Sequence, residues 1–151
     1  MASLRAQWVR YRAESYAKWQ KDTFLGDEEM DEIFRGCGGP YTRHDHTSSW
    51  CGIFAKHLLR LEKGEVYWPI GGPIKIYGSN VVRIDDHHGL DEGDVAWAPN
   101  HYFIIVMPPG DSGVPLAIHG NYAHAGPVHQ IFYGHYAKFP VSSIKCYWRI
   151  S

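Results

Sequence analysis

The character of the sequence changes near Gly89, with helical patterns before it and strand patterns after it. The later part holds five runs rich in Val, Ile, Phe, Tyr and Trp, each bounded by Gly, Pro, Asn or Asp. These runs cover residues 94–98, 102–107, 115–119, 130–136 and 145–150. Helices followed by strands are typical of an α+β fold, in which N-terminal helices pack on one face of a C-terminal antiparallel sheet. The spacing of the runs predicts a meander.

One domain accounts for residues 1–151, because a chain of this length can bury one core but leaves little for a second. We expect a helical part over about 1–62, an insert over about 63–88 and a sheet part over about 89–151. The insert is rich in Gly and Pro, with strand-like pieces at 74–77 and 81–84. The 15 basic and 16 acidic residues nearly balance, so no charge excess points to nucleic acid, and no stretch is apolar enough for membrane insertion.

Three helices are predicted in the first part. Aromatic and apolar residues recur at helical spacing over residues 3–21, namely at Leu4, Trp8, Tyr11, Tyr16 and Trp19. An acidic start and an apolar end favour a short helix over 27–34. The stretch 47–61 has one continuous apolar face, formed by Trp50, Ile53, Phe54, His57, Leu58 and Leu61.

Cys51 lies in the first turn of the third predicted helix, after three hydroxyl residues that can cap it. Unpaired N–H groups and the positive end of the helix dipole favour a thiolate there, which makes a cysteine a better nucleophile. The alternative is a small buried residue at the edge of the apolar face.

The chain contains three cysteines and no CxxC pair, which is too sparse for a disulfide framework. A bridge between Cys37 and Cys146 stays open if the protein is exported. The first residues hold no apolar segment of the kind found in a classical signal peptide. We therefore expect secretion, or delivery to the periplasm or a target cell, to use another route.

A thiolate nucleophile needs an imidazole for proton transfer and a third polar group to orient that imidazole. His101 opens a strand run, and alternation places it on one face with Phe103 and Ile105. A cysteine helix packed on that face would bring Cys51 beside the ring. His119 and Asn121 point the same way on the next run, which can return beside the first as a hairpin.

These segments resemble a known family. Trp50-Cys51-Gly-Ile-Phe-Ala at the head of a helix is similar to the nucleophile segment of CHAP amidohydrolase/peptidase domains and of NlpC-like cysteine peptidases. The stretch 93–97, Gly-Asp-Val-Ala-Trp, followed by His101, resembles their strand before the catalytic histidine. The stretch 118–121, Ile-His-Gly-Asn, resembles the segment of the third polar residue. The similarity covers about residues 41–135.

The resemblance implies a papain-like fold of the NlpC/CHAP type and an amide hydrolase that acts on peptidoglycan stems or cross-links without a cofactor. Cys51 would be the nucleophile and His101 the general base and acid, with the backbone N–H of Cys51 in an oxyanion hole. Position 119 departs from the acid that is usual in CHAP domains, but NlpC-like enzymes often have a second histidine. Whether His119 or Asn121 orients His101 stays open. Tyr41 and Trp50 are candidates for contacts with substrate or oxyanion.

Other interpretations remain. Residues 44–46, His-Asp-His, and 85–88, Asp-Asp-His-His, could ligate a divalent metal, although the predicted site contains none. The chain could be a non-catalytic interaction module, or a protease or deamidase with a protein substrate. A delivered antibacterial toxin or effector would also need a neutralising immunity protein in the producing cell.

Overall fold

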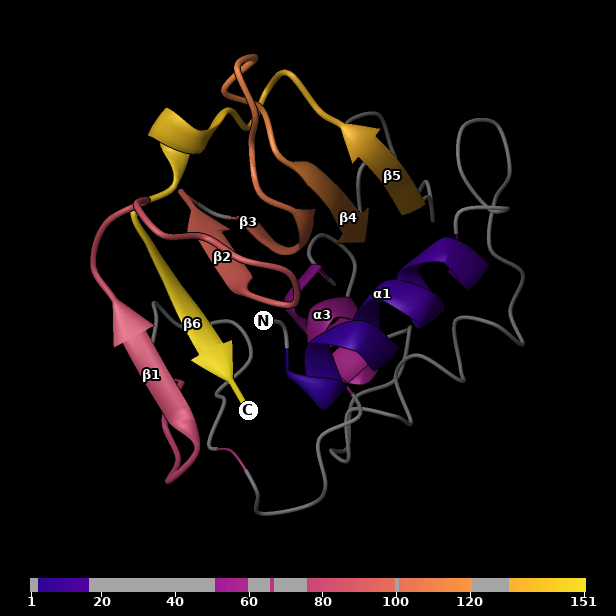
Figure 1. The fold of residues 1–151 in the computed structure, drawn as a ribbon, viewed down its shortest axis with the longest axis vertical. Coiled ribbons are helices and arrows are strands. Elements are labelled where there is room, and N and C mark those ends of the chain that lie inside the picture. Colours follow the sequence, from indigo (N-terminus) through magenta and orange to yellow (C-terminus); the bar gives the residue numbers. More distant parts are fainter. Residues whose placement is uncertain (1–2, 17–50, 60–65, 67–75, 100, 121–130) are drawn as a thin grey trace.

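The computed structural model describes residues 3–16, 51–59, 66, 76–99, 101–120 and 131–151. Within these ranges the fold is α+β, with an N-terminal helix and a C-terminal antiparallel sheet, as predicted (Figure 1). The helices are α1 (Leu4–Tyr16) and α3 (Cys51–Leu59), and the strands are β1 (Val81–Ile84), β2 (Val95–Ala98), β3 (His101–Met107), β4 (Leu116–Gly120), β5 (Ile131–His135) and β6 (Cys146–Ile150). The predicted helix at 27–34 lies outside the described residues. No helix in the described ranges is long and apolar enough to cross a bilayer.

The six strands follow the order β1-β6-β2-β3-β4-β5. The predicted meander is confirmed for β2 to β5 and wrong for β6, which pairs with β2 and β1 instead of extending the meander from β5. This crossing spans four strand positions, or about 19 Å at the usual spacing between strands. The ten residues 136–145 can reach about 33 Å when extended, so the connection is long enough. Strand β1, from the predicted insert, completes the sheet at its other edge.

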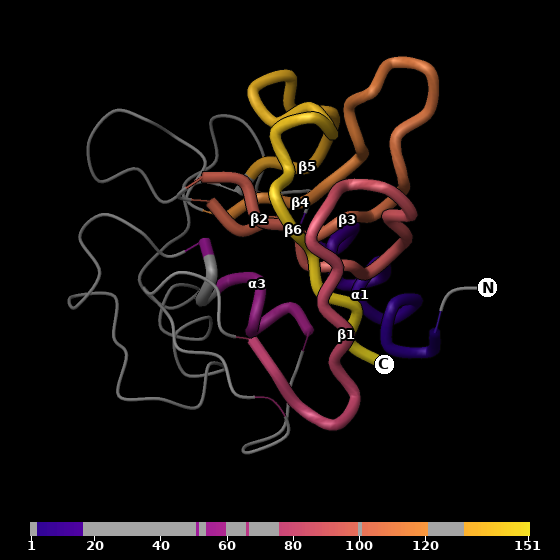
Figure 2. Tube along the Cα trace, turned by 90° about the vertical axis from the view of Figure 1, so that its left-hand side faces the viewer, coloured from indigo at the N-terminus to yellow at the C-terminus, as the bar shows by residue number. Residues whose placement is uncertain are grey.

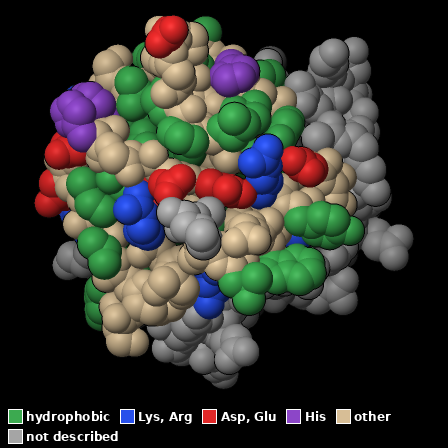
Figure 3. Space-filling view, in the orientation of Figure 1, with side chains coloured by type: hydrophobic (Ala, Val, Ile, Leu, Met, Phe, Trp, Pro, Cys, Tyr) green, Lys and Arg blue, Asp and Glu red, His purple; other side chains and the backbone are tan. Residues whose placement is uncertain are grey.

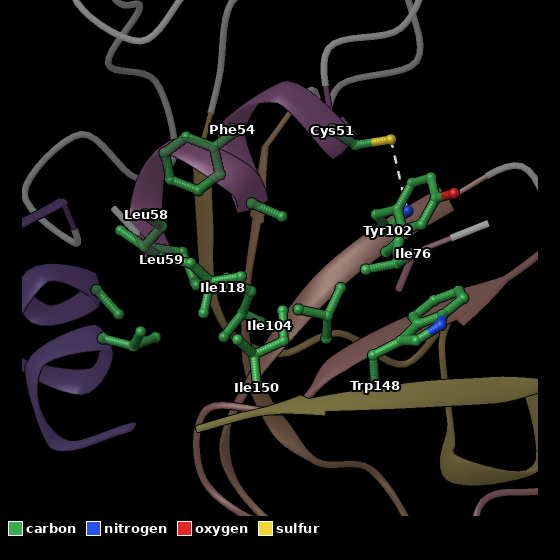
Figure 4. Close-up of a cluster of buried hydrophobic side chains, with 14 of the residues drawn as sticks. Cys51, Phe54, Leu58, Leu59, Ile76, Tyr102, Ile104, Ile118, Trp148 and Ile150 are labelled. Atoms are coloured by element: carbon green, nitrogen blue, oxygen red, sulfur yellow. Dashed lines mark hydrogen bonds between the residues drawn. The ribbon is translucent and has the colours of Figure 1, made fainter. Parts of the chain in front are cut away.

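Side chains of the sheet bury two cores, one on each face. Both helices belong to the first core, where Phe54, Leu58 and Leu59 of α3 pack with alternate residues of the strands (Figure 4). The strand residues of this core include Val95, Tyr102, Ile104, Val106, Ile118 and Trp148. The second core contains Leu90, Ala96, Phe103, Ile105, Ala117, Ile144 and Tyr147. Period-two alternation along each strand separates the two sets.

The buried side of helix α1 consists of small residues together with one aromatic residue, Tyr16, which contacts Phe54 of α3. Its buried side chains are those of Ala6, Val9, Ala13 and Tyr16. The predicted face is wrong for Leu4, Trp8 and Tyr11, because Trp8 is 53% exposed and Tyr11 is 66% exposed. Small side chains allow a close approach, which leaves no room for the bulky ring of Trp8 between the two helices.

Polar side chains of α1 also fix the end of α3. The last carbonyls of an α-helix have no partner within the helix, and its C-terminus favours positive charge. Arg12 Nε donates to the carbonyl of Leu58 at 2.6 Å, and Arg5 Nη1 donates to that of Leu59 at 3.1 Å. The Tyr16 hydroxyl lies 2.9 Å from His57 Nε2, deeper between the helices. The two helices therefore lie together on one side of the sheet (Figure 2).

Candidate functional site

The structure brings together two of the predicted site residues, His101 and His119. His101 opens β3 and His119 lies on the neighbouring strand β4. The Nε2 atom of His101 is 2.8 Å from Nδ1 of His119, and the ring planes differ by only 6°. Of the two candidates for orienting His101, His119 is thus within hydrogen-bonding distance of it. Asn121, the other candidate, lies outside the described residues.

Burial favours the neutral form of His119. His119 is 1% exposed, and burial lowers its pKa well below the usual value for histidine. The neighbouring His101 lowers that pKa further, since a second positive charge would repel the first. A neutral imidazole has one N–H donor and one acceptor nitrogen. The hydrogen bond between the rings therefore ties the tautomer of one ring to that of the other.

Aromatic rings surround this pair. Phe103 stacks on both imidazoles, with its centroid 5.6 Å from that of His101 and 4.7 Å from that of His119. Phe139, in the connection between β5 and β6, lies 4.5 Å from His101 between centroids. Tyr136 and Phe132 meet His119 edge-on. The sequence had not singled out these last three rings, because they come from a strand and a loop more than ten residues away.

Cys51 is the first residue of α3 and is 4% exposed. Its Sγ atom accepts a hydrogen bond of 3.5 Å from the backbone N–H of Tyr102, drawn as a dashed line in Figure 4. That nitrogen is about 2.4 Å from the Cα atom of His101 by covalent geometry, so Sγ lies within about 6 Å of this Cα atom. The helix thus carries the thiol to the start of the strand that begins with His101.

At the start of β3, the Cys51 thiol and the His101 imidazole lie on different faces of the sheet. His101 does share a face with Phe103, as alternation predicts. The expectation that the cysteine helix packs on that face is wrong, because α3 packs on the face formed by Tyr102, Ile104 and their neighbours. Gly120 shows why: a Cβ atom there would lie 2.6 Å from Phe54 Cβ. This glycine lets α3 approach β4 from the side opposite to His119.

The Gly93-Asp94 motif before β2 has a structural role in this fold. Asp94 is buried and accepts two hydrogen bonds from Arg149, from Nε at 2.9 Å and from Nη2 at 2.8 Å. The same carboxylate accepts from the backbone N–H of Asp91 at 2.7 Å. Gly93 has φ of 87°, and a Cβ atom there would lie 2.7 Å from that of Ala6 in α1. The motif therefore joins β6, the turn before β2 and the first helix.

The remaining predicted residues divide into two groups. Tyr41, Trp50 and Cys37 lie outside the described residues. Cys146 is a buried free thiol on β6, and burial raises its pKa. The structure thus gives the chain a second cysteine that shares a core with Cys51 and serves as its natural comparison.

The alternative metal site at residues 85–88 finds no support in the geometry. Asp85 binds Arg83 Nε at 2.6 Å, and Asp86 accepts from the backbone N–H of His88 at 2.6 Å. Among the described residues, no group of three His, Cys, Asp or Glu side chains is placed to hold a metal ion. Residues 44–46 lie outside the described ranges.

On the face in Figure 3, acidic and basic side chains lie interspersed, without a broad patch of one sign.

Comparisons with models of protein families, with curated protein sequences and with solved structures find no match to this chain.

Proposed function

We propose that the chain is a cysteine hydrolase that cleaves amide bonds of bacterial peptidoglycan, as an amidase or endopeptidase, on a papain-like domain of the NlpC/CHAP type. The observation that carries this proposal is the hydrogen bond between His101 and His119, which are buried on neighbouring strands beside the start of the cysteine helix. A thiol nucleophile needs an imidazole held in one orientation. The substrate class rests on the resemblance of the segments around Cys51, His101 and His119 to those enzymes.

In the proposed reaction, Nδ1 of His101 takes the proton of the Cys51 thiol, and the sulfur attacks the carbonyl carbon of the amide. The imidazolium then gives this proton to the leaving amine as the C–N bond breaks, which leaves a thioester on Cys51. His101 next takes a proton from water, the hydroxide displaces the sulfur, and the thiol regains its proton. His119 holds Nε2 of His101 throughout, and the backbone N–H of Cys51 stabilises the oxyanion.

The free structure differs from this reacting arrangement in one respect. Cys51 and the His101 ring lie on different faces of the sheet, so the proposed reaction requires the first turn of α3 to shift over the start of β3, and His101 can activate the thiol of the free protein only if this movement also occurs without substrate. The proposed setting is an antibacterial effector that meets its substrate in the periplasm of a target cell, with an immunity protein as its neutralising partner.

The test is incubation of purified wild type, Cys51→Ala, His119→Ala and Cys146→Ala with peptidoglycan sacculi, followed by mass spectrometry of the released fragments. We expect the wild type and Cys146→Ala to release stem peptides or split cross-links. Cys51→Ala should release none, and His119→Ala should be slower by about 10²-fold or more, the usual contribution of general acid–base catalysis. Release of the same fragments by Cys51→Ala would refute the proposal.

The burial of Cys51 favours one second candidate, a non-catalytic interaction module. In that case the thiol is a core residue that packs with Tyr102 and Trp148 on the face away from the histidine pair. Such a module leaves sacculi intact, and its Cys51 reacts no faster with iodoacetamide than Cys146. Intact sacculi together with a fast-reacting Cys51 would instead point to an amide of a protein substrate.

A further inference from the structure

Phe139 covers the histidine pair from outside the two strands that carry it. Its ring lies nearly parallel to both imidazoles, at 20° to His101 and 25° to His119, with centroids 4.5 and 5.8 Å away. Offset stacking at these distances is a favoured arrangement of aromatic rings. With the Nε2 hydrogen bond to His119 on its edge and Phe139 on its face, the His101 ring is restrained in both of its torsions.

The backbone around Phe139 is fixed at both ends. The Phe139 N–H donates to the carbonyl of Tyr136 at 2.9 Å, which closes a turn. Two residues later the Val141 N–H donates to the carbonyl of Gly113 at 2.8 Å, which ties the connection to the loop between β3 and β4. Phe139 is therefore presented to His101 by an anchored segment.

The groups that contact this cluster from other elements are mostly uncharged. Tyr136 lies edge-on to His119 with centroids 5.5 Å apart, and Phe132 of β5 does so at 6.0 Å. The one charged group among these contacts of the described residues is Lys138, an exposed residue whose Nζ lies 5.7 Å from the centroid of Phe139.

We propose that Phe139 is a positioning residue of the histidine pair, whose ring fixes the plane in which His101 Nε2 meets His119 Nδ1. An effect of Phe139 on the rate of hydrolysis rests on the proposed function, whereas its effect on the orientation of the two imidazole rings does not. Phe139 acts through His101 and contacts no reacting atom. The aromatic face is the property that matters, so another ring at this position should replace it.

The experiment compares the full chain carrying Phe139→Leu, Phe139→Tyr or Phe132→Leu with the wild type, using long-range ¹H–¹⁵N spectra of the histidine rings. Phe132→Leu is the matched control, because it removes a ring of the same cluster that meets His119 only at its edge. We expect one tautomer of His101 in the wild type, in Phe139→Tyr and in Phe132→Leu, and a mixture of tautomers in Phe139→Leu. If Phe139→Leu does not fold, two tautomers in wild type or in Phe139→Tyr would still overturn the inference.

Kinetics then separate positioning from general packing. If the chain is the proposed hydrolase, Phe139→Leu should lower kcat about 10-fold with little change in KM, as expected for a misplaced proton-transfer group, and Phe139→Tyr should restore it. A single His101 tautomer in Phe139→Leu would overturn the inference whatever the activity. A wild type without hydrolase activity that still shows the tautomer change would refute the proposed function and leave the positioning role intact.

Discussion

His101 Nε2 and His119 Nδ1 are 2.8 Å apart, and the planes of the two imidazole rings are nearly parallel although the residues come from different strands. Two buried imidazoles can share one hydrogen bond only while at least one of them stays unprotonated. Protonation of this pair at low pH should therefore lower the stability of the fold.

Acid should destabilise the protein through His119. Its pKa is lowered by burial, so the unfolded chain binds a proton near pH 6.5 while the folded chain does not. This contribution to stability is complete above about pH 6.5 and is lost as the pH falls towards the folded pKa, by up to about 1.4 kcal/mol per pH unit. Urea unfolding from about pH 7.5 to about pH 5 measures this slope.

The pH dependence of the free energy of unfolding is due to His119 if His119→Gln reduces this dependence and His135→Gln does not. His135 is an exposed histidine on β5, so its replacement serves as the control. A free energy of unfolding that stays constant over this pH range in the wild type would contradict the prediction.

Replacing Asp94 should destabilise the fold much more than replacing a carboxylate on the surface. Asp94→Asn leaves Arg149 without its buried partner, and breaking such a pair usually costs about 3 to 5 kcal/mol. Because Arg149 is itself half exposed, the lower end of this range is expected. Asp85→Asn breaks the exposed pair with Arg83 and should cost less than about 1 kcal/mol. Equal midpoints of chemical denaturation for the two variants would be inconsistent with this role of Asp94.

The close contact between α3 and β4 predicts a strong effect of a single methyl group. Gly120→Ala would place Cβ 2.6 Å from Phe54 Cβ, so the helix must move. Overpacking of this kind usually costs about 1 to 3 kcal/mol. Gly110→Ala is the control, because nothing lies within 4 Å of a Cβ atom there. Thermal unfolding that does not distinguish the two variants would argue against this packing of the helix.

Local signals in the sequence predicted the secondary structure well. The strand runs match β2 to β6 within two residues at each end, because alternation and the Gly, Pro and Asn boundaries act over short distances. The crossing of β6 to the far side of β2 depends on contacts between residues about fifty positions apart, such as Val95 and Trp148. No periodicity within either run carries that information.

The faces of the helices were harder to predict, for a physical reason in each case. In α1, hydrophobicity pointed to Trp8 and Tyr11, but the close contact with α3 selects small residues such as Ala13. Alternation along β3 correctly placed His101 on the same face as Phe103. The face on which α3 packs depends instead on the missing side chain of Gly120, which lets Phe54 approach β4 closely. Sequence reasoning thus identified the pair His101 and His119 but not the side from which Cys51 approaches it.

If His101 takes the proton of the Cys51 thiol, as proposed, the rate at which Cys51 is alkylated depends on His101, and this rate can be measured without any knowledge of the substrate. Iodoacetamide labelling of wild type and His101→Ala at about pH 6, read by peptide mass spectrometry with Cys146 as internal reference, gives this rate. We expect Cys51 in the wild type to react at least about 10-fold faster than Cys146, and His101→Ala to remove this difference. Equal rates for the two cysteines in the wild type, or a fast Cys51 that is unaffected by His101→Ala, would contradict this proposal.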